Sequence, residues 1–245
     1  MNMARFNKLM EIWEEQFPEH LQEHFQEKVL MPTVPVDIKK GCILFVGLNP
    51  SFNSDFVRGH LPKGEKNPES YFSFSNREHF DPKIDVDLTV SAKKNHPYFI
   101  KFRKTSEVLG KDWEHLDLFF WRGTSQRDFT KRFCRNENQI SGFCKKQMEM
   151  SFQIIEEAEP ICIVVANAFA SKIFIKVRKQ SVSFANQKGC FEYDIKGKKT
   201  PIFFSSMLTG GRALDNHSYL RLIWHMAKVL SIEEDFNKVW EEIVL

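Results

Sequence analysis

The sequence predicts an α/β fold in which helices pack on a mainly parallel β-sheet. Continuous apolar runs, CILFVG at 42–47 and ICIVVANA at 161–168, are typical of strands that are buried on both faces. Segments with helical periodicity, each about ten residues or longer, alternate with these runs. Such alternation favours an α/β sandwich around a parallel sheet, because parallel strands need long crossover connections.

The first elements are helical and then extended. Apolar side chains recur at helical spacing over residues 4–30, so this segment predicts one or two amphipathic helices with a break at Pro18. Residues 31–37 predict an extended connector to the first strand. Residues 48–76, after that strand, are rich in Asn, Ser, Pro and Gly and predict a long loop. A loop of such length inside a compact domain is usually functional.

The rest of the chain supplies the alternation of strands and helices. A second strand is expected at 116–121, where the sequence reads LDLFFW. The stretch CFEYDI-KGKK-TPIFFSS at 190–206 predicts a hairpin with its turn at Lys196 and Gly197. The helices are expected at 96–109, 141–158, 170–179, 218–230 and 232–244.

Length and composition bound the class of protein. A chain of 245 residues and 28.9 kDa, with 42% hydrophobic and 27% charged residues, suits one large globular domain. We expect a helical extension over 1–40 and an α/β domain over 41–245. No apolar run reaches the roughly 18 residues of a membrane-spanning helix, and acids interrupt the N-terminus where a signal peptide is apolar. We therefore expect a cytoplasmic protein (bacterial cytosol, or the nucleus in a eukaryote) with no membrane partner, and favour a monomer.

Charge and cysteine content limit the classes of partner and cofactor that we expect. Lys and Arg total 35 against 32 Asp and Glu, which gives a net charge of +3, and the pI near 8.5 is below the value of about 9 of an obvious nucleic-acid-binding domain. Local basic clusters matter more than this sum. The five cysteines form no CxxC motif, so we expect reduced, mostly buried thiols, no metal site and no cofactor.

Ligands of open α/β sheets bind beyond the carboxyl ends of the strands. The candidate segments are therefore 47–52, 121–127, 166–169 and 207–212. The strongest local signal is FVGLNPS at 45–51, because a glycine at a strand end admits a ligand close to the backbone and a proline rigidifies the turn. Asn49 adds an amide that can orient water or a polar edge. An ordinary strand-to-loop turn is the alternative interpretation.

The motif GLNPS resembles the first active-site motif of the uracil-DNA glycosylase superfamily, above all in its mismatch-specific and single-strand-selective branches, where it reads G-hydrophobic-N-P-G. The resemblance extends over roughly residues 40–230 in the order of elements. It implies a three-layer α/β/α sandwich and hydrolysis of the N-glycosidic bond of uracil, or of another deaminated or damaged base, flipped out of DNA. It also implies that Asn49 positions the water. The implied base pocket comprises Gly47, Leu48, Pro50 and Ser51, with Phe72 or Phe74 as the ring on which the base stacks.

The second motif departs from the family pattern, which commonly reads H-P-S-P or N-P-S-G. This chain has SSMLTGGRALDNHS at 205–218, and Trp121 and Arg122 stand where several branches place a base-reading Asn. We expect backbone amides and cations here to contact phosphates. The expected DNA contacts are Thr209, Gly210, Gly211, Arg212, Lys196 and Lys198. The departures keep two alternatives open: a non-catalytic nucleic-acid- or nucleotide-binding protein with the same fold, and a small-molecule hydrolase or binding protein.

Two further patterns bear on binding. The chain has 24 Phe, and four of them lie in the polar stretch after GLNPS, where a ring must pack or stack on something: Phe52, Phe56, Phe72 and Phe74. Basic residues cluster at Lys101, Arg103 and Lys104, at Lys172, Lys176, Arg178 and Lys179, and at Lys196, Lys198 and Lys199. Solvated faces are the alternative to a nucleic-acid interface for each cluster.

Overall fold

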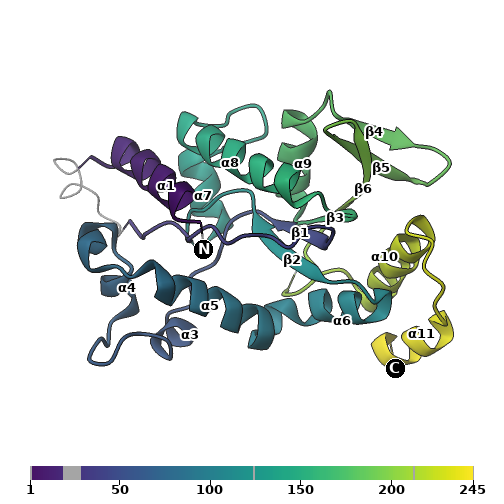
Figure 1. The fold of residues 1–245 in the computed structure, drawn as a ribbon, viewed down its shortest axis with the longest axis horizontal. Coiled ribbons are helices and arrows are strands. Elements are labelled where there is room, and N and C mark those ends of the chain that lie inside the picture. The colour runs from purple at the N-terminus through teal and green to yellow at the C-terminus, as the bar shows by residue number, and fades with distance from the viewer. Residues whose placement is uncertain (1, 19–28, 124, 212, 245) are drawn as a thin grey trace. The chain divides into compact units, whose positions relative to one another are not determined.

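The computed structural model describes residues 2–18, 29–123, 125–211 and 213–244 (Figure 1). Its strands are β1 (Ile43–Gly47), β2 (Trp113–Asp117), β3 (Cys162–Ala166), β4 (Val182–Ala185), β5 (Cys190–Ile195) and β6 (Lys198–Ser205). Its α-helices are α1 (Met3–Gln16), α3 (Ser54–Arg58), α4 (Pro68–Tyr71), α5 (Pro82–Asn95), α6 (Ile100–Leu109), α7 (Gln126–Phe133), α8 (Gly142–Ala158), α9 (Ala168–Val177), α10 (Asn216–Val229) and α11 (Phe236–Val244). Two 3₁₀ helices, η1 (Phe74–His79) and η2 (Pro97–Phe99), complete the elements.

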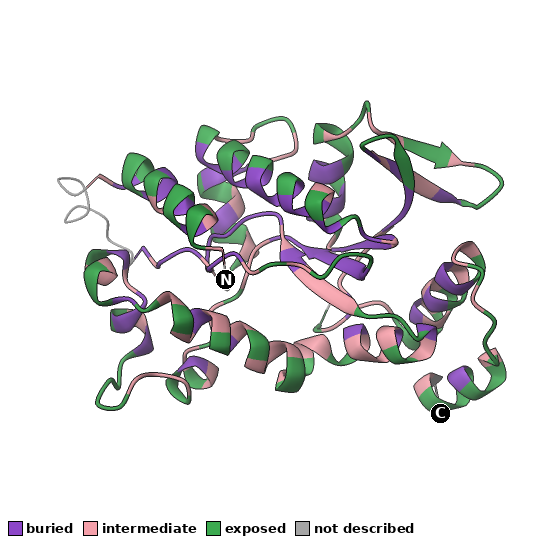
Figure 2. Ribbon diagram, viewed as in Figure 1, coloured by how far each residue is buried: buried purple, intermediate pink, exposed green. Residues whose placement is uncertain are grey.

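The six strands form one mixed, mostly parallel sheet in the order β2-β1-β3-β6-β5-β4. β1 pairs with β3 and β3 with β6 in parallel, whereas β5 is antiparallel to both β6 and β4. β1 and β3 lie inside the sheet and are buried at every position, as their apolar sequences predict (Figure 2). The α/β class is therefore confirmed, with helices flanking the sheet.

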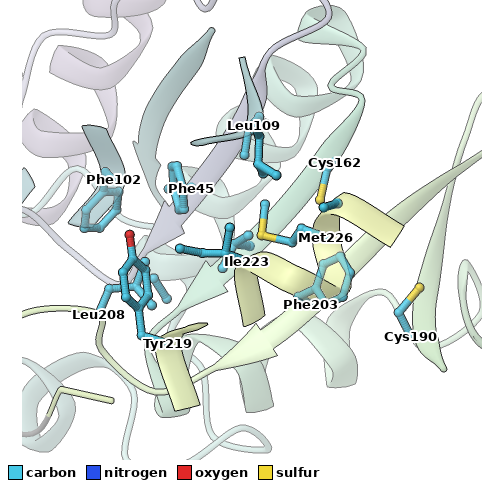
Figure 3. Close-up of a cluster of buried hydrophobic side chains, with 14 residues drawn as sticks. Phe45, Phe102, Leu109, Cys162, Cys190, Phe203, Leu208, Tyr219, Ile223 and Met226 are labelled. Atoms are coloured by element: carbon cyan, nitrogen blue, oxygen red, sulfur yellow. The ribbon is translucent and has the colours of Figure 1, made fainter. Parts of the chain in front are cut away.

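One face of the sheet carries a large cluster of buried apolar side chains (Figure 3). The register aligns Phe45 with Val164 and Val164 with Phe203, so these side chains point to the same face. Phe102 of α6 contacts Phe45 edge to face, with ring centroids 4.6 Å apart. Tyr219, Ile223 and Met226 of α10 complete this cluster. Burial of these side chains holds α6 and α10 on that face.

Helix α9 covers the opposite face. Phe174 of α9 packs edge to face on Tyr193 of β5 and Phe204 of β6, at 5.3 and 6.0 Å between centroids. Ser171, one turn earlier, donates its hydroxyl to the Asn167 carbonyl at 2.9 Å. Asn167 in turn caps the helix by accepting from the backbone N–H groups of Phe169 and Ala170. The asparagine at the end of β3 therefore fixes where α9 begins.

The chain divides into two compact units. One unit comprises 38–48, 96–116 and 153–245 and contains nearly all of the sheet. The other comprises 1–37, 49–95 and 117–152. In this second unit, which we call the Asn49 unit, α1 packs through Trp13 against Phe143 of α8, with centroids 4.7 Å apart. The expectation of a separate extension over 1–40 before a domain over 41–245 stays a prediction.

Most expected elements are present. The expectations for 42–47, 161–168 and the hairpin at 190–206 are confirmed by β1, β3 and β5–β6. The helices expected at 96–109, 141–158, 170–179, 218–230 and 232–244 correspond to η2 with α6, and to α8, α9, α10 and α11. α1 confirms the start of the helical segment expected at 4–30, whereas residues 19–28 lie outside the described part of the chain.

Two expectations about element type were wrong. The strand expected at 116–121 is found as β2 at 113–117, and the next residues leave the sheet because Phe120 N donates to Gln147 Oε1 and Phe120 O accepts from Thr33 N. The segment 48–76, expected to be a loop, contains the helices α3 and α4. Its asparagines suggested a loop, but two of them cap the N-termini of these helices. Asn53 accepts from Phe56 N, and Asn67 accepts from Ser70 N. Helices α5 and α7 and strand β4 were not expected.

Every helix in the described ranges falls short of the length and hydrophobicity that a bilayer-spanning segment requires.

Candidate functional site

The site begins where β1 ends. Gly47 closes the strand, Leu48 is buried beyond it, and Asn49 and Pro50 are half-buried. Apolar burial of β1 therefore delivers one polar side chain, Asn49, at the carboxyl end of a central strand. Ser51, the next polar residue, is exposed.

The amide of Asn49 is fixed by backbone carbonyls. Its Nδ2 donates to the carbonyl oxygens of Gly123 at 2.9 Å, Trp121 at 3.3 Å and Pro50 at 3.3 Å. Three acceptors surround this end of the amide, so the nitrogen must face them and the oxygen must point away. The orientation of the side chain is set by the turn at 121–123, which is more than 70 residues away in sequence.

The other end of the amide makes no bond within the described part of the chain. Asn49 Oδ1 accepts no hydrogen bond from a residue in the described ranges, and Asn49 as a whole is half-buried. An amide oxygen in this position accepts a hydrogen bond from water or from a ligand N–H group. It cannot remove a proton from water, so its contribution is orientation.

The turn that holds Asn49 is itself tightly packed. Gly123 N donates to Pro50 O at 2.9 Å, which joins the two segments by a second link. A Cβ on Gly123 would lie 3.0 Å from Trp121 Nε1 and 4.0 Å from Asn49 Nδ2. A side chain at 123 would therefore crowd the Trp121 indole, which would have to shift by a few tenths of an ångström, whereas the backbone conformation at 123 does not call for glycine.

A buried ion pair anchors the same turn. Arg122 is 6% exposed and Asp85 of α5 is fully buried, and the two form a salt bridge. Arg122 Nε also donates to Met31 O at 3.0 Å, and Asp85 Oδ2 accepts from Val34 N at 2.7 Å. These bonds tie α5, the extended segment at 31–34 and the turn together. In the sequence, Arg122 stands out only as a departure from the base-reading Asn, and nothing in the local pattern pairs it with Asp85.

The two rings expected to stack on a base are both in the core. Phe72 and Phe74 are 0% exposed. The guanidinium of Arg122 lies over the Phe72 ring at 4.9 Å from its centroid, and Phe80 packs edge to face on the same ring at 5.3 Å. Neither ring has a face available to a base in this structure. Of the remaining rings, Phe52 is half-buried and packs edge to face on Phe72 at 5.6 Å.

The loop after β6 leaves from the same end of the sheet as Gly47. The register places Val46, Val165 and Phe204 side by side, so the carboxyl ends of β1, β3 and β6 lie at the same end of the sheet. In this loop Thr209 Oγ1 donates to Tyr98 O at 2.9 Å, and Gly210 has φ +89°. Gly211 is exposed, whereas Arg212 lies outside the described residues.

The two lysines expected to assist this loop lie at the other end of β6. Lys198 is the first residue of the strand, and Lys196 lies in the hairpin turn before it. An eight-residue strand is roughly 25 Å long, so about this distance along β6 separates Lys196 and Lys198 from Thr209 and Gly210. Their joint contact with DNA stays a prediction.

One ionisable residue at a strand end was missed. Asp117 is the last residue of β2, the neighbour of β1 in the sheet, and burial raises the pKa of its carboxyl to about 7. The sequence predicts a single buried strand at 116–121, which places Asp117 inside the strand and not at its end. A carboxyl with such a pKa exchanges protons near neutral pH.

The cysteines are free and buried, as the sequence predicts. Burial raises the pKa of the Cys134 thiol to about 11 and that of Cys144 to about 12, which suppresses the reactive thiolate. Among the residues that the structure describes, no group of three or more His, Cys, Asp or Glu side chains could hold a metal ion.

The sequence matches no protein-family model and shows no significant similarity to a curated protein.

Proposed function

We propose that this protein is a DNA glycosylase that hydrolyses the N-glycosidic bond of uracil, or of another deaminated or damaged base, in DNA. The proposal includes a three-layer α/β/α sandwich of the uracil-DNA glycosylase type, in line with the helices on both sheet faces. The observation that carries it is the amide of Asn49. A fixed nitrogen, and an oxygen that accepts no hydrogen bond from the described residues, suit the water-positioning role that the GLNPS motif implies.

The chemistry follows from the charge that develops as the bond breaks. The sugar becomes cationic and the departing base becomes anionic, so a water molecule must be held on one side and donors on the other. Asn49 Oδ1 accepts a hydrogen bond from that water and orients its lone pair toward the sugar. Since an amide is a weak base, the water attacks a sugar that is already largely cationic. The bond between sugar and base breaks, a bond from the sugar to the water oxygen forms, and the proton that the water loses passes to the departing base anion or to bulk solvent. We therefore expect slower turnover than with a carboxylate in this position.

The remaining parts of the site are assigned by position. Gly47, Leu48, Pro50 and Ser51 surround Asn49 in sequence and form the proposed base pocket. Phe52, three residues after Asn49 and half-buried, takes the stacking position that Phe72 and Phe74 cannot occupy. Backbone amides of the loop at 209–211 contact DNA phosphates.

The test is a single-turnover screen for abasic sites. Excess protein is incubated with oligonucleotides that contain uracil, hypoxanthine or a mismatch, single- and double-stranded, and alkaline cleavage reveals abasic product. We expect product with at least one substrate and a loss of 100-fold or more in Asn49→Ala, on the order of what removal of a positioning group costs. Asn138→Ala, an exposed asparagine of the same unit, is the matched control. Absence of abasic product from every substrate would overturn the proposal.

A non-catalytic nucleic-acid- or nucleotide-binding protein is the second candidate. Two observations favour it: Phe72 and Phe74 have no free face, and the Arg122 guanidinium is engaged with Asp85 rather than available to a base. In that case the protein binds DNA in a salt-dependent manner and releases no base. The same oligonucleotides, analysed for binding and for abasic product in parallel, separate the two candidates.

A further inference from the structure

A strongly basic segment lies far from the GLNPS motif in sequence. Residues 172–199 contain eight Lys or Arg and two acidic residues, an excess that is larger than the net charge of +3 of the whole chain. Five of these lysines are exposed and form no ion pair with any residue in the described ranges: Lys172, Lys176, Lys179, Lys196 and Lys198. The segment comprises α9, β4, β5 and the turn into β6.

The fold brings one lysine of each cluster, Lys179 and Lys196, to one end of the sheet. Val182, the first residue of β4, pairs with Tyr193, and Asp194 N donates to Ser181 O at 2.8 Å. The chain that precedes Ser181 therefore runs beside the chain that follows Asp194. Lys179 at the end of α9 and Lys196 in the hairpin turn consequently flank the same end of β4 and β5.

A row of aromatic rings crosses the neighbouring strands on one face. Phe204 of β6 contacts Phe191 of β5, and Phe191 contacts Phe184 of β4, with centroids 5.3 and 5.1 Å apart. Exposure increases along the row, from the half-buried Phe204 to Phe184, which is 51% exposed. β4 is the last strand of the sheet (Figure 1), so Phe184 of β4 lies at the edge of the sheet.

We propose that this surface, the Phe184 ring with the lysines of 172–198, binds single-stranded nucleic acid. A ring exposed at a sheet edge offers a face to an unpaired base, and exposed lysines without carboxylate partners offer contacts to the backbone phosphates. A duplex hides its bases from such a ring. A second copy of this chain is disfavoured as the occupant, because the same lysines would face each other and β4 has only four residues.

This binding goes beyond the proposed glycosylase activity and does not depend on Asn49. The two can therefore fail separately. If Asn49→Ala loses abasic product but binds the oligonucleotide as wild type does, the result bears on the glycosylase proposal alone. If Phe184→Ala loses binding while Asn49 is intact, the result bears on the binding surface alone.

The test is fluorescence anisotropy of the full-length protein with a labelled oligo(dT) strand and with a duplex of equal length, at several salt concentrations. Phe184→Ala is expected to weaken binding of the single strand about tenfold without changing the salt slope, since it removes stacking alone. Lys179→Gln with Lys196→Gln is expected to reduce the salt slope by roughly 1.4, about 0.7 for each phosphate that is no longer neutralised. Trp240→Ala and Lys238→Gln, exposed residues of α11, are the matched controls and should leave both quantities unchanged.

Three results would overturn the proposal. One is no binding of oligo(dT) by the wild-type protein at low salt. Another is equal binding of strand and duplex with no effect of Phe184→Ala, which would indicate electrostatic attraction only. The third is a dimer in sedimentation velocity that Phe184→Ala converts to a monomer, because a second copy would then cover the surface.

Discussion

At the scale of single residues, Asn49 shows why an amide and a carboxylate are not interchangeable here. Its Nδ2 faces three carbonyl oxygens of residues 50, 121 and 123. A carboxylate of the same shape would place an oxygen against those three acceptors and would satisfy none of them. The turn at 121–123 therefore selects a donor at position 49, whatever the reaction requires.

Asn49→Asp should therefore destabilise the protein rather than improve it. We expect a loss of about 1–3 kcal/mol in the free energy of unfolding at neutral pH, because partly buried carbonyls lose their donor. The difference from wild type should shrink at acidic pH, where a protonated carboxyl again donates one hydrogen bond. Urea unfolding of wild type, Asn49→Asp and Asn49→Ala at neutral and acidic pH measures this. An aspartate variant as stable as wild type at neutral pH would contradict the orientation of the amide.

Asp117 gives the stability a definite dependence on pH. Burial raises the pKa of its carboxyl in the folded protein to about 7, from an ordinary value of 3.8. Between these values the folded state keeps a proton that the unfolded state has released, so this residue lowers stability as the pH rises from about 4 to about 7. Below that range both states are protonated, and above it both are ionised.

Asp117→Asn should remove this dependence. Relative to wild type, the variant is expected to gain stability progressively between about pH 4 and pH 7 and to keep a constant advantage above it. Urea unfolding across the range measures the difference in unfolding free energy, with Asp87→Asn, an exposed position in α5, as the control. A difference that is flat with pH would show that the carboxyl is already ionised at low pH in the folded protein.

At the scale of elements, the sequence predicts the strands and helices whose own residues form a clear hydrophobic or turn pattern. β1 and β3 are continuous apolar runs, and the β5–β6 hairpin has two residues with positive φ, Lys196 and Gly197, between its arms. α5 and α7 escaped prediction because their sequences are largely polar and their burial is limited. β4 has only four residues, two of them exposed, so no pattern could develop.

Some residues of the candidate site could likewise be predicted from a local sequence pattern, and others could not. The position of Asn49 follows from a local rule, a buried strand that ends at glycine. Its partners at 121–123 and the pairing of Arg122 with Asp85 depend on contacts between distant segments, which no local pattern contains. The burial of Phe72 likewise follows from Arg122 and Phe80 packing on it rather than from its polar sequence surroundings.

Breaking the Arg122–Asp85 pair should lower the free energy of unfolding far more than breaking an exposed ion pair. Asp85→Ala leaves the buried guanidinium without its counter-ion and is expected to cost about 3–5 kcal/mol. Combining Asp85→Ala with Arg122→Met should cost less than the sum of the single changes. A double-mutant cycle by urea unfolding measures this coupling. For the exposed pair Asp55–Arg58 the same cycle should give less than about 1 kcal/mol. Additive losses at Arg122 and Asp85 would contradict a coupled pair.

At the scale of the whole molecule, the surplus of phenylalanine is used chiefly for packing. Of the 24 Phe, nine are among the largest fully buried side chains, and they are distributed over both units: Phe17, Phe45, Phe72, Phe74, Phe102, Phe119, Phe129, Phe152 and Phe174. Among the described phenylalanines, Phe184 differs in lying at the sheet edge, more than half exposed. The placement of the rings, rather than their number, separates core residues from candidates for binding.

The thiols provide a test of packing across the molecule. All five cysteines are free and buried, and burial raises the pKa of Cys134, Cys144, Cys162 and Cys190. We expect the native protein to react with a thiol reagent far more slowly than free cysteine at mildly alkaline pH, and all five groups to react after denaturation. Reagent absorbance with and without urea measures both. Fast reaction of one thiol in the native protein would identify a region that opens readily.

The Asn49 unit also constrains how the protein is made. It is assembled from three separate stretches of chain, and Trp13 of α1 finds its partner Phe143 only about 130 residues later. At a synthesis rate of roughly 5–20 residues per second, the apolar side of α1 waits on the order of ten seconds without that partner. During this interval the nascent chain exposes Phe6, Leu9, Trp13 and Phe17 together. Until then, the apolar side of α1 is open to non-native contacts, well before the sheet is complete.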